Sequence, residues 1–331
     1  MLCLNLKPQK YFMKIILAPM EGVVDFNMRQ LLTDIGGFDL CVTEFVRIVD
    51  QVLSAKVYLR YCPELLTSGK TRSGTPVRVQ LLGQDANYLA ENALIASDLG
   101  SHGIDLNFGC PAKTVNKSKG GAVLLKTPEH IYDIVKKVRE VVPKKNEVSA
   151  KIRLGFDDDS LSQEIFDAIN QAGANTITIH ARTKKDGYRP PAYWEKIKPL
   201  LKTHHKMQVI ANGEVWSLDD YKRCQLKSGC NDIMIGRGAL AKPDLAKQIM
   251  QSNLGNKYTS LTWQNILHHI IDSSMHNEDP KKDKYFSSRT KQWLRFLQFT
   301  YPEAVLLFND IKRFKLKEDV LNMLKIHANS I

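Results

Sequence analysis

The sequence lacks the features that mark exported, disulfide-stabilised or membrane-spanning proteins. Its six cysteines form no CxxC pair and show no zinc-ribbon spacing, so neither a disulfide framework nor a metal knuckle is expected. No uninterrupted apolar run reaches about 18 residues, the length that suggests a transmembrane helix. The opening residues, MLCLNLKPQKYF, contain neither the apolar core nor the cleavage site of a secretion signal. We therefore expect a monomer of the reducing cytosol, with no membrane partner and no metal.

Acidic residues are few relative to basic ones. Lysine and arginine number 47 against 35 aspartates and glutamates, a formal net charge of +12. This excess favours a polyanionic partner, although net charge speaks to association and not to fold. A basic protein with a solvated surface is the alternative interpretation of the charge alone.

Short runs rich in Val, Ile and Leu recur along roughly 240 residues. Runs this apolar are typical of parallel strands covered on both faces, and eight of them match a (β/α)8 TIM barrel. A doubly wound sheet is the rival fold, but it predicts a glycine fingerprint after the first strand, where APMEGVVD stands instead. The eight predicted strands lie within residues 14–20, 40–46, 76–83, 103–109, 147–155, 176–183, 207–215 and 232–240.

The stretches between these runs read as outer helices. Their apolar residues recur at three- and four-residue spacing, and Asp85 and Thr127 stand where two helices should be capped. The alternation stops near residue 252, and SNLGNKYTS is typical of a linker. We expect an N-terminal extension over residues 1–13, a barrel over 14–252 and a smaller all-helical domain over 256–331. Because Met13 directly precedes the first strand, residues 1–12 are an upstream extension or a misplaced start.

Polar residues end nearly every run, at the rim where this barrel class carries its active sites. The last two runs close with Asn-Gly-Glu and Gly-Arg-Gly, where such barrels bind phosphate through backbone N–H groups and a nearby cation. Taken singly, each glycine pair reads equally well as a tight turn. Lys151 lies inside an apolar run, which is costly unless an anion or a glutamate compensates it. With His180 and Arg237, it favours a phosphorylated ligand.

Cys110 occupies a Gly-Cys-Pro turn at the end of the fourth run, and Lys113, Lys117 and Lys119 follow it. A lone cysteine is usually a small buried residue. Here the turn directs the side chain to the rim, and the lysines supply positive charge. Proton donation and nucleophilic attack are both open, and the lack of an activating base nearby makes donation at least as favourable.

These residues match a known family. From Lys14 onward the chain resembles the tRNA-dihydrouridine synthases, flavin enzymes that reduce uridines in transfer RNA. The motifs that carry the resemblance are LAPMEGVVD, DLCVTEFVR, VQLLGQD, IDLNFGCPAKTVNKSKGGAVLL, KIRLG, IHARTKKDGY, VIANGEV and IGRGAL. The segments VTEFVR, HARTKKDGYRPPAYW and RTKQWLRFL are most similar to the C-type subfamily, which resembles enzymes that modify uridine 16 of the D-loop.

The resemblance implies an FMN across the barrel mouth, reduced by NADPH. In the family chemistry, a hydride passes from the flavin to C6 of the uracil while Cys110 protonates C5, and Asn107 orients the base. By motif, the ring would be backed by Pro19, Met20 and Glu21, and its polar edge bonded by Gln80 and Lys151. The ribityl phosphate would be held by His180, Asn212, Gly213, Glu214, Gly236 and Arg237.

A uridine inside folded tRNA must leave its stack to reach such a pocket, so the enzyme must grip the surrounding backbone. Between Lys281 and Lys317 there are ten basic and three acidic residues, which predicts an RNA clamp packed by an aromatic stripe of Phe286, Trp293 and Leu297. A solvated charged helix is the alternative. The predicted tRNA contacts are Arg47, Asn107, Tyr188, Lys284, Arg289, Lys291 and Arg295.

Two other functions stay open on the sequence. The first is an FMN barrel oxidoreductase that acts on a free pyrimidine, and the basic helical region argues against it. The second is an RNA-binding protein that has lost catalysis, and the intact Cys110 argues against that.

Overall fold

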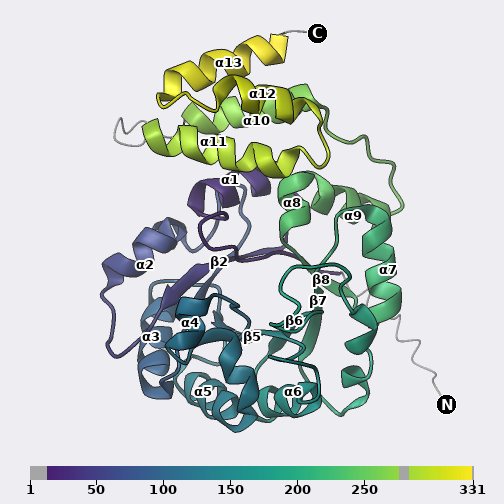
Figure 1. Cartoon of the computed structure of the whole chain (residues 1–331). Helices are drawn as coiled ribbons and strands as arrows, with labels where there is room; N and C mark the ends of the chain where they lie inside the picture. The colour runs from purple at the N-terminus through teal and green to yellow at the C-terminus, as the bar shows by residue number, and fades with distance from the viewer. Residues whose placement is uncertain (1–12, 276–282, 330–331) are drawn as a thin grey trace, which may run out of the picture.

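A computed structural model describes residues 13–275 and 283–329. The N-terminal extension lies outside these residues apart from Met13. The chain forms a closed barrel of eight parallel strands in sequence order, in which β8 pairs with β1 (Figure 1). The predicted TIM barrel is confirmed, and the closure rules out the doubly wound sheet. The strands are β1 (Ile15–Leu17), β2 (Leu40–Arg47), β3 (Val77–Leu82), β4 (Ile104–Asn107), β5 (Val148–Arg153), β6 (Thr176–His180), β7 (Gln208–Asn212) and β8 (Asp232–Ile235).

The strands are apolar because both of their faces are covered. All six residues of β3 are buried, for example, since one side faces the barrel interior and the other the outer helices. Inside the barrel, side chains from four strands and the residue that follows β1 form a compact cluster, which comprises Ile16, Ala18, Val42, Ile210 and Met234. The larger core lies between the sheet and the helices. This cluster fills part of the barrel interior.

The outer helices surround the barrel (Figure 1). They are α1 (Phe26–Ile35), α2 (Ala55–Tyr61), α3 (Ala86–Asp98), α4 (Lys113–Lys117), α5 (Pro128–Val141), α6 (Ser162–Gln171), α7 (Leu218–Ser228), α8 (Arg237–Ala241) and α9 (Leu245–Asn253). Asp85 caps α3 as predicted, because its carboxylate accepts the backbone N–H groups of Asn87 and Tyr88 at 2.9 and 3.0 Å. Thr127 also precedes its helix, but its hydroxyl donates backwards to Leu124 and does not cap the first turn.

Four further helices form a layer over one edge of the barrel (Figure 1): α10 (Trp263–Met275), α11 (Asp283–Leu297), α12 (Glu303–Ile311) and α13 (Lys317–Asn329). Helix α11 packs against α8, and α10 packs against α1. Phe286, Trp293 and Leu297 are buried, so the predicted aromatic stripe does pack this layer. None of the helices described here is long and apolar enough to cross a membrane.

Candidate active site

The carboxyl ends of the strands enclose a cavity of about 520 Å³. A smaller cavity of about 80 Å³ shares part of its wall. Together they bring all the predicted cofactor residues and Cys110 to one place, along with Asn107 and Tyr188. The larger cavity is lined by Pro19, Met20, Glu21, Gln80, Asn107, Cys110, Lys151, Arg153, His180, Tyr188, Arg237 and Phe296, among others. The smaller one adds Asn212, Gly213, Glu214 and Gly236.

A row of buried amides fixes the turn that presents Cys110. The Asn107 side-chain oxygen accepts the backbone N–H groups of Gly109 and Cys110, both at 2.9 Å. The Asn107 amide nitrogen donates to Gln80 at 2.8 Å, and Gln80 donates to the carboxylate of Asp105 at 2.7 Å. A side-chain amide donates only from its nitrogen and accepts only at its oxygen. These hydrogen bonds therefore fix the orientation of the Asn107 and Gln80 side chains. The sequence analysis missed Asp105, which lies within an apolar strand.

The thiol of Cys110 is half-buried in this wall. Burial raises its pKa above the ordinary value, and the carboxylate of Glu21 adds to the effect. A backbone N–H group at Ala112 and the charges of Arg153 and Lys151 oppose it. The thiol is thus protonated near neutral pH, which suits a proton donor better than a nucleophile.

Cations line the same cavity. Lys151 is half-buried, and its ammonium donates to Asn212 at 3.1 Å. Burial lowers its pKa to about 8, the charge of Arg153 adds to this, and Asp105 opposes it. Burial and the charges of Arg153 and Lys151 also hold the pKa of His180 well below its usual value, so the imidazole is neutral. A cluster of this kind is costly unless an anion occupies the space beside it.

Glu214 organises the arginines of the rim. Its carboxylate pairs with Arg182 at 2.8 Å and with Arg237 at 2.7 Å. The Arg237 guanidinium also lies between two rings, 5.0 Å from the centre of Tyr188 and 5.1 Å from that of Trp216. Glu214 therefore directs its charge to these arginines and holds Arg237 at the cavity.

Gly213 allows the chain to pass close to His180. Its φ of 117° lies in a region that other residues rarely adopt, and a side-chain carbon there would come within 2.9 Å of the imidazole. The glycine is thus needed for the close packing of β6 and β7 at this edge of the cavity. In the described residues, no group of three or more His, Cys, Asp or Glu is arranged to hold a metal ion.

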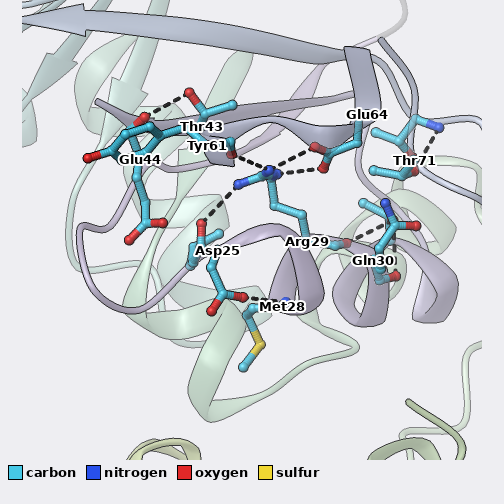
Figure 2. A network of polar contacts seen from close by, with 12 residues as sticks. Asp25, Met28, Arg29, Gln30, Thr43, Glu44, Tyr61, Glu64 and Thr71 are labelled. Atoms are coloured by element: carbon cyan, nitrogen blue, oxygen red, sulfur yellow. Dashed lines mark hydrogen bonds and ion pairs between the residues drawn. The ribbon is translucent and has the colours of Figure 1, made fainter. Parts of the chain in front are cut away.

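A buried ion pair supports the loop between β1 and α1, which carries Met20. Arg29 of α1 bonds Glu64 at 2.8 and 2.9 Å, and both side chains are fully buried (Figure 2). The same guanidinium donates to the carbonyl oxygens of Val24 and Tyr61 at 3.2 and 3.0 Å. Loss of one partner of such a pair typically costs about 3–5 kcal/mol. The sequence signal was a charged residue on the apolar face of a helix, but nothing local identified Glu64 as its partner.

The other predicted tRNA contacts lie outside the cavity. Arg47 ends β2, and its side chain is exposed and donates to Ser118 at 2.5 Å. Lys284 and Arg295 are exposed on α11. Lys291 is half-buried, and its ammonium donates to the carbonyl oxygen of Phe314 at 2.8 Å, within the helical layer.

Arg289 differs from these residues because it faces the barrel. Its guanidinium pairs with Asp25 at 2.9 Å and also donates to the carbonyl oxygen of Gly22. Arg289 therefore contacts the loop that carries Met20, whereas the other predicted α11 contacts lie elsewhere on the helix.

Comparison with known families assigns the chain to a family. Residues 16–328 match the family model described as dihydrouridine synthase. The chain belongs to this family. The resemblance drawn from the motifs is thus confirmed.

Several curated relatives are similar along nearly their whole length. The chain is 51% identical over 313 residues to a tRNA-dihydrouridine(16) synthase of Shewanella oneidensis, which covers 95% of this chain and 98% of that protein. It is 49% identical over 309 residues to the protein of that name from Haemophilus influenzae, with coverage of 93% and 98%. It is 47% identical over 301 residues to the one from Pseudomonas putida, with coverage of 91% and 93%.

Two more distant solved structures share the fold. A 2-naphthoyl-CoA reductase complex superposes with a TM-score of 0.55 at 12% identity, over 72% of this chain and 50% of that one. Histamine dehydrogenase from Rhizobium sp. 4-9 gives a TM-score of 0.54 at 13% identity, over 79% and 48%. The chain spans about half the length of each, and the likeness concerns the fold alone.

Proposed function

We propose that this protein is an FMN-dependent tRNA-dihydrouridine synthase that uses NADPH and reduces the C5–C6 bond of uridine 16 in the D-loop of tRNA. The observation that carries the proposal is the position of the Cys110 thiol on the wall of a cavity that is also lined by Lys151, Arg153 and Arg237. The 51% identity to a protein named tRNA-dihydrouridine(16) synthase supports the choice of substrate.

The residues of the cavity fit a phosphorylated flavin. The half-buried charge of Lys151 beside Arg153 favours an anion, and Arg237 reaches the rim of the same space. We assign the phosphate to His180, Asn212, Gly213, Gly236 and Arg237, with Glu214 holding Arg237. The ring would lie over Pro19, Met20 and Glu21, with its polar edge at Gln80 and Lys151. Bound FMN, once reduced by NADPH, supplies the hydride that adds to C6 of the uracil.

The chain's own residues complete the reduction with a proton. Cys110 carries that proton at neutral pH because its pKa is raised, and the hydrogen bonds of Asn107 hold the thiol at the cavity wall. The S–H bond breaks as a C–H bond forms at C5, which balances the hydride gained at C6. Lys151 and Arg153 lower the energy of the thiolate that is left, since their charges favour the ionised form.

The target uridine has to leave its stack, which requires contacts to the surrounding tRNA backbone. The exposed cations Arg47, Lys284 and Arg295 are suited to phosphate contacts. Tyr188 is 54% exposed and lies against Arg153 and Arg237, so its exposed part can contact a base. Asn107 would contact the uracil itself.

The test is dihydrouridine formation by purified Cys110→Ala protein on tRNA that lacks the modification. We expect the variant to retain flavin and tRNA binding but to lose most product in a single turnover, because the thiol donates a proton and does not hold the cofactor. Cys224→Ala is the matched control, since Cys224 is buried in α7 away from the cavity. Undiminished product from Cys110→Ala would exclude the proposed role of the thiol. Parent activity on free uridine but not on tRNA would favour the free-pyrimidine reductase, and a parent protein without flavin would favour the inactive RNA-binding protein.

A further inference from the structure

Helix α11 has two faces with different surroundings. Tyr285, Arg289, Gln292 and Phe296 recur at three- and four-residue spacing and so share one face. All four are half-buried, and this face meets the barrel. Lys284, Lys291 and Arg295 share a second face, turned by roughly 110° around the helix axis, where Lys284 and Arg295 are exposed. The basic surface and the barrel contact are thus carried by one rigid element.

The barrel-facing side of α11 grips the loop between β1 and α1. Arg289 pairs with Asp25 at 2.9 Å, and Tyr285 donates from its hydroxyl to the same carboxylate. Both Arg289 and Gln292 donate to the carbonyl oxygen of Gly22, the latter at 3.0 Å. Asp25 also caps α1, because it accepts the backbone N–H group of Met28 at 3.0 Å (Figure 2).

The same helix also supports α8, which follows β8 on the other side of the barrel seam. Trp293 is buried and donates from its ring nitrogen to the carbonyl oxygen of Leu240 in α8 at 2.9 Å. Since β8 pairs with β1, the β1–α1 loop and α8, which α11 contacts, are neighbours at the rim. One turn further along, Phe296 lines the 520 Å³ cavity together with Cys110 and Met20. The helix therefore supports the β1–α1 loop and α8 and closes part of the site.

We propose that Arg289 is a positioning residue: it fixes the β1–α1 loop, and with it Met20 and Glu21, in the geometry needed for reduction. This inference rests on the proposed function and reassigns Arg289 from tRNA contact to coupling between the helical layer and the cavity. The pair is suited to this role because the side chains of Arg289 and Asp25 are only 24% and 14% exposed, so water and salt screen it little. A tRNA that binds the basic face of α11 would thereby act on a helix already joined to the reaction site.

The experiment compares Arg289→Gln with Lys284→Gln, two losses of one positive charge from different faces of α11, in the full-length flavoprotein. Measured quantities are kcat for dihydrouridine formation per bound flavin, the Kd for tRNA at several salt concentrations, and the visible spectrum of the flavin. For Arg289→Gln we expect a fall in kcat of at least about tenfold, since small misplacements of reacting groups cost this much or more. Its Kd for tRNA should stay within about twofold and its salt slope should be unchanged, whereas the flavin spectrum should shift. Lys284→Gln should instead raise the Kd and lower the salt slope by about one.

Two further variants separate positioning from simple stability. Arg289→Lys keeps a cation opposite Asp25 and should recover part of the lost kcat. Asp25→Asn combined with Arg289→Gln should cost no more than the larger single effect, because both changes remove one interaction. A lower thermal midpoint with normal kcat per bound flavin would overturn the proposal, as would a weaker Kd for tRNA with normal kcat. A parent protein that makes no dihydrouridine would refute the proposed function instead, while the flavin spectrum of Arg289→Gln would still report on the loop.

Discussion

The side-chain oxygen of Asn107 accepts the backbone N–H of Cys110 at 2.9 Å, so the residue next to the strand end sets the direction of the thiol. The same oxygen accepts the N–H of Gly109, and Arg153 donates to the carbonyl oxygen of Gly109 at 2.8 Å. Asn107 thus holds the N–H groups of the turn, and Arg153 holds one of its carbonyl oxygens. Asn107 can bind a base in the cavity only through the hydrogen-bonding capacity that its contacts with this turn leave unused.

Asn107→Ala should therefore disturb catalysis and stability together. Two buried N–H groups lose their acceptor, which costs roughly 1–3 kcal/mol in the free energy of unfolding, and a misplaced thiol should lower kcat by about 100-fold. Asn146→Ala is the control, because Asn146 bonds Ser97 at 2.7 Å on the opposite end of the barrel and its loss should affect stability alone. Urea unfolding and single-turnover product formation measure the two effects. Normal turnover by Asn107→Ala would mean that the Asn107 amide does not determine the position of the Cys110 thiol.

The positions of the strands were predictable because a parallel barrel buries both faces of each strand, and that leaves an uninterrupted apolar run for every one. The site followed because all eight strands point the same way, so polar residues that are far apart in sequence meet at one rim. Gly213 and Arg237 were found on this basis alone.

Pairings between distant segments were not predictable in the same way. Arg29 and Glu64 are 35 positions apart, and Arg289 lies 264 positions after Asp25. Arg29 stands on the apolar face of its helix, whereas the other three look like ordinary charged surface positions in their own segments, and only the packing of α1 and α11 makes them partners. Arg289 was accordingly grouped with the RNA contacts. The same holds for Lys291, whose bond to Phe314 depends on the turn between α12 and α13.

The affinity for flavin should fall as the pH rises above 8. The pKa of Lys151 is lowered to about 8, so its ammonium is charged below that pH and neutral above it. If the cofactor binds best to the charged form, the Kd should rise by up to about tenfold per pH unit above 8. Titration of flavin-free protein with FMN between pH 7 and 9.5 measures this, and Lys151→Met should remove the dependence. The Kd for riboflavin should depend on pH as the Kd for FMN does if Lys151 bonds the ring edge. A Kd for the parent protein that is constant over this range would contradict the assignment.

Arg237→Ala should weaken flavin retention. It removes a cation at the rim, and a charge-assisted hydrogen bond of this kind contributes about 1.5–3 kcal/mol, which corresponds to a Kd raised by roughly 10- to 150-fold. Arg223→Ala is the matched control, because Arg223 is 65% exposed on α7 and pairs with Asp220. The flavin content of the purified proteins, with a titration of each, measures the effect. Full flavin content in Arg237→Ala would place the phosphate elsewhere.

The choice of uridine should depend on the basic face of α11. A pocket that receives one uracil has little with which to distinguish uridines, so the tRNA body must be docked by contacts outside it. Lys284 and Arg295 are exposed there, whereas Lys291 is occupied by Phe314, which makes Lys284→Glu with Arg295→Glu the cleaner double variant.

This double variant should weaken tRNA binding and reduce its salt slope by about two, while reduction of the flavin by NADPH stays normal. Lys222→Glu with Lys227→Glu on α7 changes the net charge equally on a different exposed helix and serves as the control. If both double variants lost affinity equally, the effect would come from overall charge and not from docking by α11. Nucleoside mapping of tRNA from cells without this protein tests the position itself: dihydrouridine should disappear at position 16 and persist elsewhere, because docking presents a single uridine to the cavity. Its persistence at position 16 with loss at another site would show that α11 docks the tRNA in a different orientation.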